Sequence, residues 1–365
     1  MVETTPRGYP HRQERLPDSL DAVDAEWLTR ILRNRYPAIS VDRLDRLELI
    51  PGHTTKLRIA VALSGEGAEG IPAQLCLKSN WSGSPLSGGA NVNEARFYKD
   101  LAEGLALPAP PCFYADWDDD AEGHQGLLVL EDMEPWGGRF GTSAEPITVD
   151  QALKGVEALA RLHGSTWGDP RLDRATWLFT AMAPDNPGDD YWDMMESHFD
   201  KVNRLPERVA IFPSWFAHEP HKLREAWFQL GRYDLAQPGP RCLVHGDAHL
   251  GNSYGMPDGT RLFLDWQIVR KGRPWRDYTY FAGGSIPIEE RRRAERDILA
   301  HYLAELATFG VTIPFDVAWD EYRRWMVWGL VAWQSNINPK EDTMATLERF
   351  CAAAKDLEID KLYNL

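Results

Sequence analysis

Cysteine and long apolar runs are scarce in this sequence. The four cysteines are far apart and form no C-x-x-C pair, so we expect reduced core thiols rather than a disulfide framework or a cysteine-rich metal site. No stretch approaches the roughly 18 consecutive apolar residues of a membrane-spanning helix. Residues 1–20 are polar and contain prolines and arginines, unlike the apolar centre of a signal peptide. These features predict a cytoplasmic protein.

Positive charge is also in deficit. Lys and Arg number 40 against 55 Asp and Glu, which gives a formal net charge of −15. An acidic surface repels phosphate backbones and anionic lipid headgroups, so neither nucleic acid nor a membrane is an expected partner. The same charge would suit a cationic substrate, but it is also common among soluble proteins that bind none.

Apolar and aromatic residues, by contrast, are plentiful. The chain has 365 residues, of which 43% are hydrophobic, and it contains 15 tryptophans. This length suggests two domains or one domain of two lobes, and the apolar content is enough for a sizeable core. Because a tryptophan buries a large apolar area, most of them are expected in the core, and a few are candidates to line a binding pocket.

The first third of the chain has mostly strand-like patterns. We expect a helix from Leu20 to Tyr36 that opens at Asp21, followed by strands in "VDRLDRLELI", "KLRIAVAL" and "PAQLCLKSN". A Ser/Gly-rich loop at 79–90 precedes a second helix that ends at Gly104. The runs "LPAPPCFYADW" and "GLLVLEDM" complete a small antiparallel β-rich lobe, which we assign to residues 1–133.

The remaining residues, 134–365, are mainly helical in pattern. "VDQALKGVEALARLHGSTW" is an amphipathic helix, and further helical stretches continue to about residue 235. Residues 241–267 then form short strands around loops, with a hairpin turn at Pro257–Gly259. From Ile288 to the end the pattern is helical again. The predicted fold class is therefore α+β, with a β-rich lobe followed by a larger helical lobe.

The most specific pattern is H-x-D-x-x-x-x-N, from His245 to Asn252, followed by Asp265 at the end of the strand "RLFLD". Phosphoryl transfer needs one carboxylate to orient the attacking hydroxyl or accept its proton. It also needs an amide and a second carboxylate to hold Mg²⁺ against the nucleotide phosphates. The hairpin would return Asp265 beside the loop that carries Asp247 and Asn252, so the spacing agrees with this requirement.

Four further residues in the first lobe suit a nucleotide. Lys78 ends the strand "LCLK", where a kinase needs a lysine on the α- and β-phosphates. Glu94 opens the next helix and is a candidate partner for that lysine. Glu131 and Met133 follow an apolar strand where the chain leaves the first lobe, and backbone groups there could bind an adenine edge. The order of these residues along the chain, more than any one of them, favours a kinase.

Two other functions use the same residues. His245, Asp247, His249 and Asp265 could all be ligands of a binuclear metal-dependent phosphohydrolase. However, the amide of Asn252 and the upstream lysine fit only a kinase. A nucleotide-binding pseudokinase is the other alternative. The joint presence of Lys78, Asp247, Asn252 and Asp265 argues against it. We interpret His245 as a loop anchor, whereas the role of His249 stays open between solvent and a phosphate.

The block "LVHGDAHLGN" followed by "LFLDWQ" resembles the aminoglycoside-phosphotransferase and choline-kinase-like branch of the protein-kinase-like fold. With Gln267 it is most similar to the ecdysteroid-kinase-like subgroup. The resemblance implies that Asp247 is the catalytic base and that Asn252 and Asp265 bind Mg²⁺. It also implies that Lys78, paired with Glu94, binds the phosphates of ATP or GTP. The absence of an A-P-E segment argues against a protein kinase.

The sequence departs from the kinase pattern at the glycine-rich loop. Residues 51–56 read "PGHTTK" without G-x-G-x-x-G, so Thr54 and Thr55 are the candidates to cover the phosphates. The choice between ATP and GTP is therefore open. Asp277, after the metal-binding strand, is expected to be a structural anchor for the catalytic loop.

The acceptor is expected to be a small molecule with a free hydroxyl, such as a secondary metabolite, an antibiotic or a sterol-like alcohol. Trp325 and Trp328, three residues apart on one helix face, are candidates to contact an apolar acceptor, although such stripes are often core. Asp190 and Tyr191, in an acidic and aromatic stretch, are candidates to contact a cationic one. The sequence does not name the acceptor or the oligomeric state.

Overall fold

The computed structural model describes residues 15–52, 54–81, 88–105, 107–120, 123–180, 199–202, 204–336 and 341–365. The chain forms two compact units. The first comprises residues 1–105, 109–137 and 265–268, and the second comprises residues 106–108, 138–264 and 269–365. The sequence pattern placed the boundary at 133/134. It did not indicate that Asp265–Ile268 packs with the first unit.

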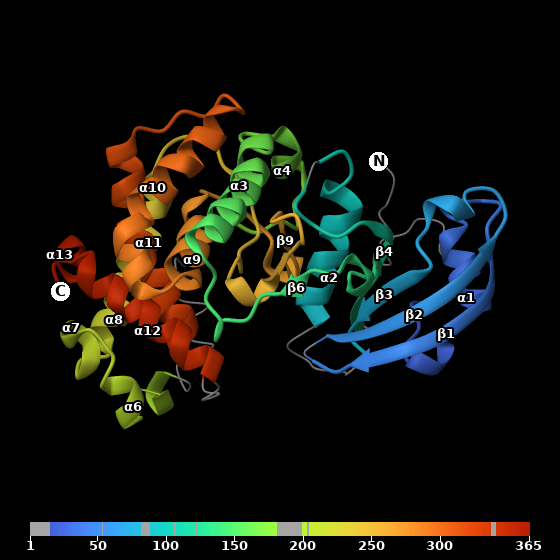
Figure 1. Ribbon diagram of the computed structural model, residues 1–365, viewed down its shortest axis with the longest axis horizontal. Coiled ribbons are helices and arrows are strands. Elements are labelled where there is room, and N and C mark those ends of the chain that lie inside the picture. The colour runs from blue at the N-terminus through green and yellow to red at the C-terminus, as the bar shows by residue number, and fades with distance from the viewer. Residues whose placement is uncertain are drawn as a thin grey trace. The chain divides into compact units, whose positions relative to one another are not determined.

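The first unit is built on one antiparallel sheet with the strand order β1-β2-β3-β5-β4 (Figure 1). Its strands are β1 (Ser40–Ile50), β2 (Thr55–Ser64), β3 (Gln74–Ser79), β4 (Cys112–Asp120) and β5 (Gly123–Glu131). The first three predicted strands are β1, β2 and β3, which pair antiparallel in sequence order. The predicted antiparallel sheet of the first lobe is thus confirmed.

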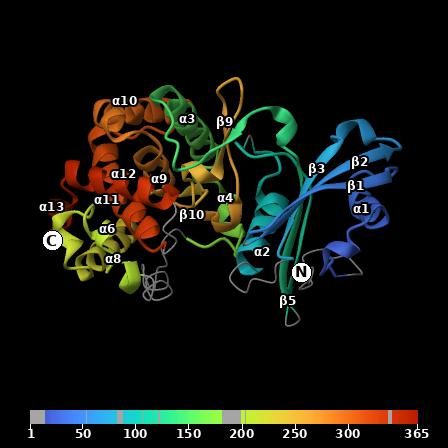
Figure 2. The ribbon, with the colours of Figure 1, turned by 60° about the horizontal axis from the view of Figure 1, so that its bottom comes forward.

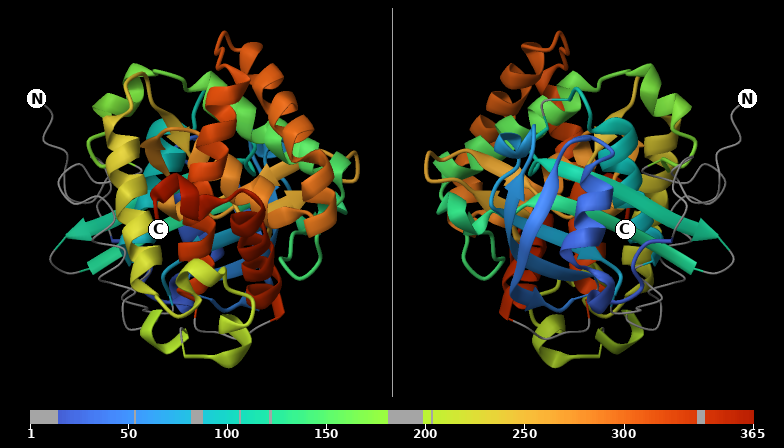
Figure 3. Two further views of the ribbon diagram at one scale, coloured as in Figure 1. Left: turned by 90° about the vertical axis from the view of Figure 1, so that its left-hand side faces the viewer. Right: turned by 90° about the vertical axis from the view of Figure 1, so that its right-hand side faces the viewer.

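The two faces of this sheet carry different helices. Leu75 and Leu77 of β3 belong to the same apolar core as Trp27 and Leu28 of helix α1 (Ala25–Leu32), which lies across the sheet (Figure 3). Successive side chains of a strand point to opposite faces, so Lys78 points to the other face. Helix α2 (Gly88–Arg96) packs on β4 and β5, on the side of the sheet away from α1 (Figure 2).

Two helix starts differ from those predicted. Helix α1 begins at Ala25, because the Asp24 carboxylate caps it by accepting a hydrogen bond from the Trp27 N–H. Residues Leu20–Ala22 form only a short 3₁₀ turn. Helix α2 begins at Gly88, inside the predicted loop, and continues through a π-helical turn at Phe97–Leu101. Glu94 therefore lies in the second half of α2 and does not open it.

Helices make up most of the second unit. They are α3 (Val149–Ser165), α4 (Pro170–Arg174), α6 (Pro206–Val209), α7 (Ser214–Ala217), α8 (His221–Ala236), α9 (Trp275–Ser285), α10 (Ile288–Ala307), α11 (Phe315–Gln334), α12 (Glu341–Asp356) and α13 (Ile359–Tyr363). Helix α9 is buried along its whole length and packs against α3, α11 and α12 (Figure 1). The predicted helix at 149–167 and the helical pattern after Ile288 are confirmed.

Short strands lie between α8 and α9, as predicted. They are β7 (Cys242–Val244), β8 (Ser253–Gly255), β9 (Arg261–Phe263) and β10 (Arg270–Gly272), with β6 (Arg139–Phe140) beside β8. Strands β8 and β9 form the predicted hairpin. Its turn needs Gly259, whose φ of 90° lies in the left-handed region that favours glycine. Further 3₁₀ turns occur at Ala68–Gly70, Glu134–Trp136, Leu250–Asn252 and Trp266–Ile268.

The four cysteines are free thiols. Cys242 and Cys351 are buried, and Cys76 and Cys112 are half-buried, so the expected core location holds fully for only two of them. In the part of the chain that the structure describes, no helix has the length and apolar character needed to cross a bilayer.

Candidate active site

Lys78 and Glu94 form a buried ion pair in the first unit. The Lys78 Nζ lies 2.7 Å from a Glu94 carboxylate oxygen and 2.8 Å from Oδ1 of Asp265. The Lys78 and Glu94 side chains are almost fully buried, whereas that of Asp265 is 35% exposed. Burial alone would lower the pKa of Lys78, but the two carboxylates outweigh it and raise that pKa. Lys78 is therefore a fixed cation.

Glu94 also holds the residue after Asp265. Its second carboxylate oxygen accepts a hydrogen bond from the Trp266 N–H at 3.1 Å, and the Trp266 ring stacks on Phe97 with 4.5 Å between centroids. Burial and the nearby Asp265 raise the pKa of Glu94 despite the lysine. Asp265 itself has a φ of 66°, a conformation that Asp tolerates better than most residues and that is frequent at functional sites.

The loop from His245 to Asn252 lies in the second unit, and Asp277 of α9 fixes its start. The Asp277 carboxylate accepts hydrogen bonds from the N–H groups of His245 at 2.5 Å and Gly246 at 2.8 Å. It also contacts Nε2 of His163 at 3.2 Å, while Nδ1 of that ring lies 2.8 Å from the Tyr302 hydroxyl. Asp277 is therefore the predicted structural anchor. Burial would raise its pKa, but the hydrogen bonds and the nearby histidines lower it.

His245 is committed to the loop through both ring nitrogens. Its Nδ1 accepts a hydrogen bond from the Asp247 N–H at 3.2 Å, and its Nε2 lies 2.8 Å from the Leu264 carbonyl oxygen. A neutral imidazole has one acceptor and one donor nitrogen, so Nε2 carries the proton here. No ring nitrogen remains for a metal ion or for proton transfer. The predicted role of His245 as a loop anchor is confirmed.

Asp247 and Asn252 face each other across the loop. The Asn252 Nδ2 donates hydrogen bonds to the Asp247 carboxylate at 2.9 Å and to the Asp247 carbonyl at 3.0 Å. This arrangement orients the carboxylate of Asp247, which is about one-quarter exposed. It also leaves Oδ1 as the ligand atom that Asn252 can offer to a metal ion, and an oxygen is the atom that Mg²⁺ prefers.

His249 lies between Asp247 and two aromatic residues. Its Nδ1 accepts a hydrogen bond from the Gly251 N–H at 3.0 Å, and its Nε2 lies 3.7 Å from a carboxylate oxygen of Asp247. Its ring makes edge contacts with Tyr280 and Trp333, with centroids 5.7 and 5.3 Å apart. The sequence analysis did not identify Tyr280 or Trp333. No local motif marks either residue, because they come from separate helices.

The predicted acceptor residues differ in what the structure shows. Trp325 is fully buried, and Trp328 is buried beneath the guanidinium of Arg276, 3.7 Å from its ring centroid. Both thus contribute to the core of the helical unit, and contact with an acceptor stays a prediction for each. Asp190 and Tyr191 lie outside the described residues.

The predicted nucleotide contacts in the first unit are engaged within that unit. The Thr54 side chain, which is buried, accepts a hydrogen bond from Nε2 of Gln267 at 3.2 Å. Thr55 is also buried and begins β2. The Glu131 carboxylate accepts a hydrogen bond from the Trp136 indole, and the Met133 carbonyl accepts one from the Trp136 N–H. Nucleotide binding by these residues stays a prediction.

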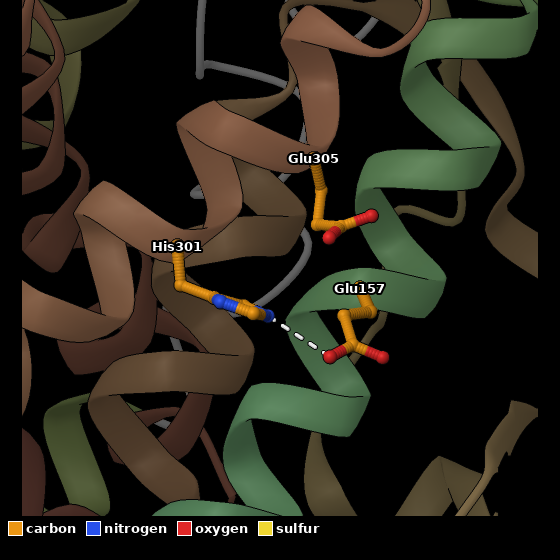
Figure 4. A group of neighbouring side chains, drawn as sticks. All are labelled: Glu157, His301 and Glu305. Atoms are coloured by element: carbon orange, nitrogen blue, oxygen red, sulfur yellow. Dashed lines mark hydrogen bonds and ion pairs between the residues drawn. The ribbon is translucent and has the colours of Figure 1, made fainter.

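One cluster with the spacing of metal ligands lies away from the residues proposed for a metal-dependent hydrolase. Among the described residues, the group that meets the spacing of metal ligands is Glu157, His301 and Glu305, on α3 and α10 (Figure 4). His301 is 2.9 Å from Glu157, which also forms an ion pair with Lys154. This half-exposed group links two helices and lies apart from the H-x-D-x-x-x-x-N loop in sequence.

Comparison with known proteins gives a family and a fold. No curated protein matches the chain. A candidate aminoglycoside phosphotransferase from Ralstonia eutropha has 15% identity and a TM-score of 0.56, over 93% of this chain and 98% of that one. A choline kinase from Streptococcus pneumoniae has 15% identity and a TM-score of 0.46, over 91% and 98% of the two chains. A spectinomycin phosphotransferase solved with ADP and spectinomycin has 14% identity and a TM-score of 0.48, over 94% and 99%.

At this level of identity, the first of these similarities shows the fold. The chain has an α+β protein-kinase-like fold, with an antiparallel β-rich first part and a helical second part, as predicted. The model of the ecdysteroid kinase-like family matches residues 95–312. Because this match covers more than half of its length, the chain belongs to the ecdysteroid kinase-like family.

Proposed function

We propose that this chain is a kinase that transfers the γ-phosphate of ATP or GTP to a hydroxyl group of a small molecule. The observation that carries this proposal is the buried Lys78, held between Glu94 and Asp265 at 2.7 and 2.8 Å. Burying a lysine is costly unless carboxylates compensate it. In kinases a lysine buried and paired in this way provides a cation at a fixed position against the nucleotide phosphates.

Asp247 is proposed to be the catalytic base. The acceptor hydroxyl oxygen attacks the γ-phosphorus as its proton passes to the Asp247 carboxylate. The bond from the γ-phosphorus to the bridging oxygen breaks, and the nucleoside diphosphate leaves. The hydrogen bond from Asn252 to the Asp247 carboxylate supports this role, because a base must be held in the geometry of the reaction.

Asn252 and Asp265 are proposed to hold Mg²⁺. Asn252 fits this role because its amide nitrogen is occupied by Asp247, which turns its oxygen into the available ligand atom. Asp265 supplies a partly exposed carboxylate, and hard oxygen ligands of this kind suit Mg²⁺. When bound, the ion would neutralise charge on the β- and γ-phosphates.

The acceptor is proposed to present an apolar surface next to its hydroxyl. The rings of Tyr280 and Trp333, which are buried, pack on His249, whose ring lies beside the carboxylate of Asp247. The surroundings of the proposed base are therefore apolar on this side, which favours a ligand with an apolar face. The family match and the similarity to a candidate aminoglycoside phosphotransferase support a hydroxylated small molecule. A cationic acceptor bound near Asp190 and Tyr191 is the alternative.

The test is nucleotide consumption with a panel of hydroxylated compounds, measured for the wild type and Asp247→Asn. We expect the variant to lose about 10²–10⁴-fold in turnover, since it lacks a positioned base, while its nucleotide dissociation constant is unchanged. Asp258→Asn is the matched control, because Asp258 lies on the exposed turn of the β8–β9 hairpin. Turnover of Asp247→Asn within a few-fold of the wild type would remove this residue from the reaction.

The same assay separates the alternatives. A pseudokinase would bind nucleotide without transferring phosphate to any compound. A metal-dependent phosphohydrolase would release phosphate from esters without nucleotide. The panel also reports on the acceptor, because the apparent affinity of a cationic compound should fall with added salt, whereas that of an apolar alcohol should not.

A further inference from the structure

Three consecutive residues after β9 each hold a different part of the first unit. Asp265 binds Lys78 of β3, and Trp266 binds Glu94 of α2. Gln267 has two partners, since its carbonyl oxygen accepts a hydrogen bond from Nδ2 of Asn93 at 2.7 Å and its side-chain amide donates one to Thr54. The segment thus connects β3, α2 and the loop between β1 and β2.

Thr54 lies in the loop that would cover the nucleotide phosphates. This loop is short and lacks the G-x-G-x-x-G pattern, so it has few glycine N–H groups to wrap around an anion. The Thr54 side chain is only 3% exposed, and its hydroxyl contacts Gln267 within the same unit. Thr55 already belongs to β2, where it pairs with Ser79. Thr54 is therefore the residue through which Gln267 holds the loop.

We infer that Gln267 is a positioning residue that fixes the β1–β2 loop for nucleotide binding by hydrogen bonding to Thr54. This inference rests on the proposed kinase function. In this chain the hydrogen bond between Gln267 and Thr54 would fix the loop that in other kinases is rich in glycine. The Thr54 hydroxyl serves as the anchor of the loop.

The position of Gln267 also couples the loop to the metal ligand. Gln267 follows Asp265 by two residues. Two neighbouring residues of α2 hold this segment: Asn93 donates a hydrogen bond to the Gln267 carbonyl, and Glu94 accepts one from the Trp266 N–H. A shift of Asp265 would therefore be transmitted along a short, hydrogen-bonded segment to the loop. The side-chain amide of Gln267 makes the final contact, with Thr54. It can be removed by mutation without altering the carboxylates of Asp265 and Glu94.

The test is a double-mutant cycle on Gln267→Ala and Thr54→Val, with nucleotide affinity measured by calorimetry in saturating Mg²⁺. We expect each single variant to weaken nucleotide binding about tenfold, as for the loss of one hydrogen bond that is shielded from water on the Thr54 side. The double variant should bind no more weakly than either single one, because both remove the same bond. Thr54→Ser keeps the hydroxyl and should bind like the wild type, and the KM for the acceptor should not change.

Gln125→Ala is the matched control. Its Nε2 likewise donates within the first unit, to the Pro17 carbonyl at 2.7 Å and to Ser79 at 2.9 Å, so it reports the effect of losing a half-buried amide elsewhere. Nucleotide affinity of this control should stay within twofold of the wild type. Equal losses in Gln125→Ala and Gln267→Ala would mean general destabilisation and would overturn the inference, as would additive effects of Gln267→Ala and Thr54→Val.

Hydrogen exchange without nucleotide separates this inference from the proposed function. Peptides covering residues 51–56 should exchange faster in Gln267→Ala than in the wild type, while peptides of α1 should not. A wild type that binds no nucleotide would refute the kinase proposal, even if the exchange result showed that Gln267 fixes the loop. A wild type that binds nucleotide, with affinity and loop exchange unchanged in Gln267→Ala, would refute only the inference.

Discussion

Asp277 shows how one buried carboxylate fixes the backbone of a loop. It accepts hydrogen bonds from two consecutive N–H groups, at His245 and Gly246, and a third contact comes from His163. Arg276 adds a hydrogen bond to the Gly246 carbonyl at 2.8 Å. Because the Asp247 carboxylate follows directly, the position of the proposed base depends on these buried contacts.

We predict that Asp277→Asn lowers the free energy of unfolding by about 2–3 kcal/mol. An asparagine has only one acceptor oxygen, so one of the two buried N–H groups would face an amide NH₂ and lose its partner. Urea denaturation at pH 7 measures the change. Asp258→Asn, at an exposed turn, should stay within about 0.5 kcal/mol of the wild type, and a similarly small change for Asp277→Asn would contradict the anchoring role.

The pH dependence of this difference follows from the pKa of Asp277, which is lowered in the folded protein. A lowered folded-state pKa contributes stability that is complete above the unfolded pKa of about 3.9. That contribution is lost as the pH falls through the folded value. The difference in unfolding free energy between the wild type and Asp277→Asn should thus be constant from about pH 5 to 8 and shrink below about pH 4. A difference that grew on acidification would be inconsistent with this sign.

Helices α9, α11 and α12 pack closely around one aromatic ring. Three glycines form a socket for the side chain of Phe350. The buried ring of Phe350 on α12 lies against Gly283 and Gly284 of α9 and Gly329 of α11. It also stacks on Tyr280, with 5.8 Å between centroids. A Cβ at Gly329 would approach the ring to 2.1 Å, and the ring cannot retreat because the α9 glycines touch it on another side.

We therefore expect Gly329→Ala to destabilise the protein, although alanine is the better helix former. The gain in helix propensity of about 1 kcal/mol is smaller than the cost of overpacking a closed core, about 1–3 kcal/mol. Gly70→Ala is the control, since nothing lies within 4 Å of its Cβ and its φ is not positive. Thermal unfolding of the two variants measures the effect, and a raised melting temperature for Gly329→Ala would show that the socket can widen.

Element identity could be predicted from the sequence because periodicity is a local signal. The strands of the first unit, the amphipathic α3 and the β8–β9 hairpin follow from residue patterns within a few positions. The start of α1 was misplaced because Asp21 and Asp24 are both acceptable caps, and only the structure shows that Asp24 binds Trp27. The start of α2 was misplaced because Gly88 and Gly89 are typical of loops.

The candidate site could be proposed from the sequence only where it follows a motif. Asp247, Asn252 and Asp265 were proposed from their spacing and stay a prediction, and the ion pair of Lys78 with Glu94 agrees with the expected partnership. His163 was not identified as a contact of Asp277, because 114 positions separate them. The contact of Trp333 with His249 was not identified for the same reason, since Trp333 reaches His249 from the end of a distant helix.

At the scale of the whole molecule, the first unit is discontinuous in sequence. Its main part ends at Gly137, and Asp265–Ile268 is added from far along the chain. This late segment supplies the second carboxylate at Lys78, the N–H that binds Glu94 and the ring that stacks on Phe97. The face of the sheet that carries α2 therefore depends on it, whereas the core between the sheet and α1 does not.

A fragment of residues 1–137 tests this dependence. We expect hydrogen exchange in β3 and α2 to be faster in the fragment than in the intact protein, while exchange in α1 and its contacts on the sheet stays slow. Joining residues 264–269 to the fragment through a flexible Gly/Ser linker should restore protection in α2, and the linker alone should not. Equal protection of α2 with and without the added segment would contradict the proposed dependence.

The discontinuity has a consequence for synthesis on the ribosome. The strands and α1 of the first unit are synthesised early. The ion pairs of Lys78, however, lack Asp265 until that residue has been translated, more than a hundred residues after Gly137. At typical elongation rates this interval is on the order of ten seconds. During it, the nascent chain carries an unfinished polar pocket on a nearly complete sheet. Completion of the first unit thus waits for translation of residues 245–265, so a truncated chain cannot complete the ion pairs of Lys78 before the proposed base has been made.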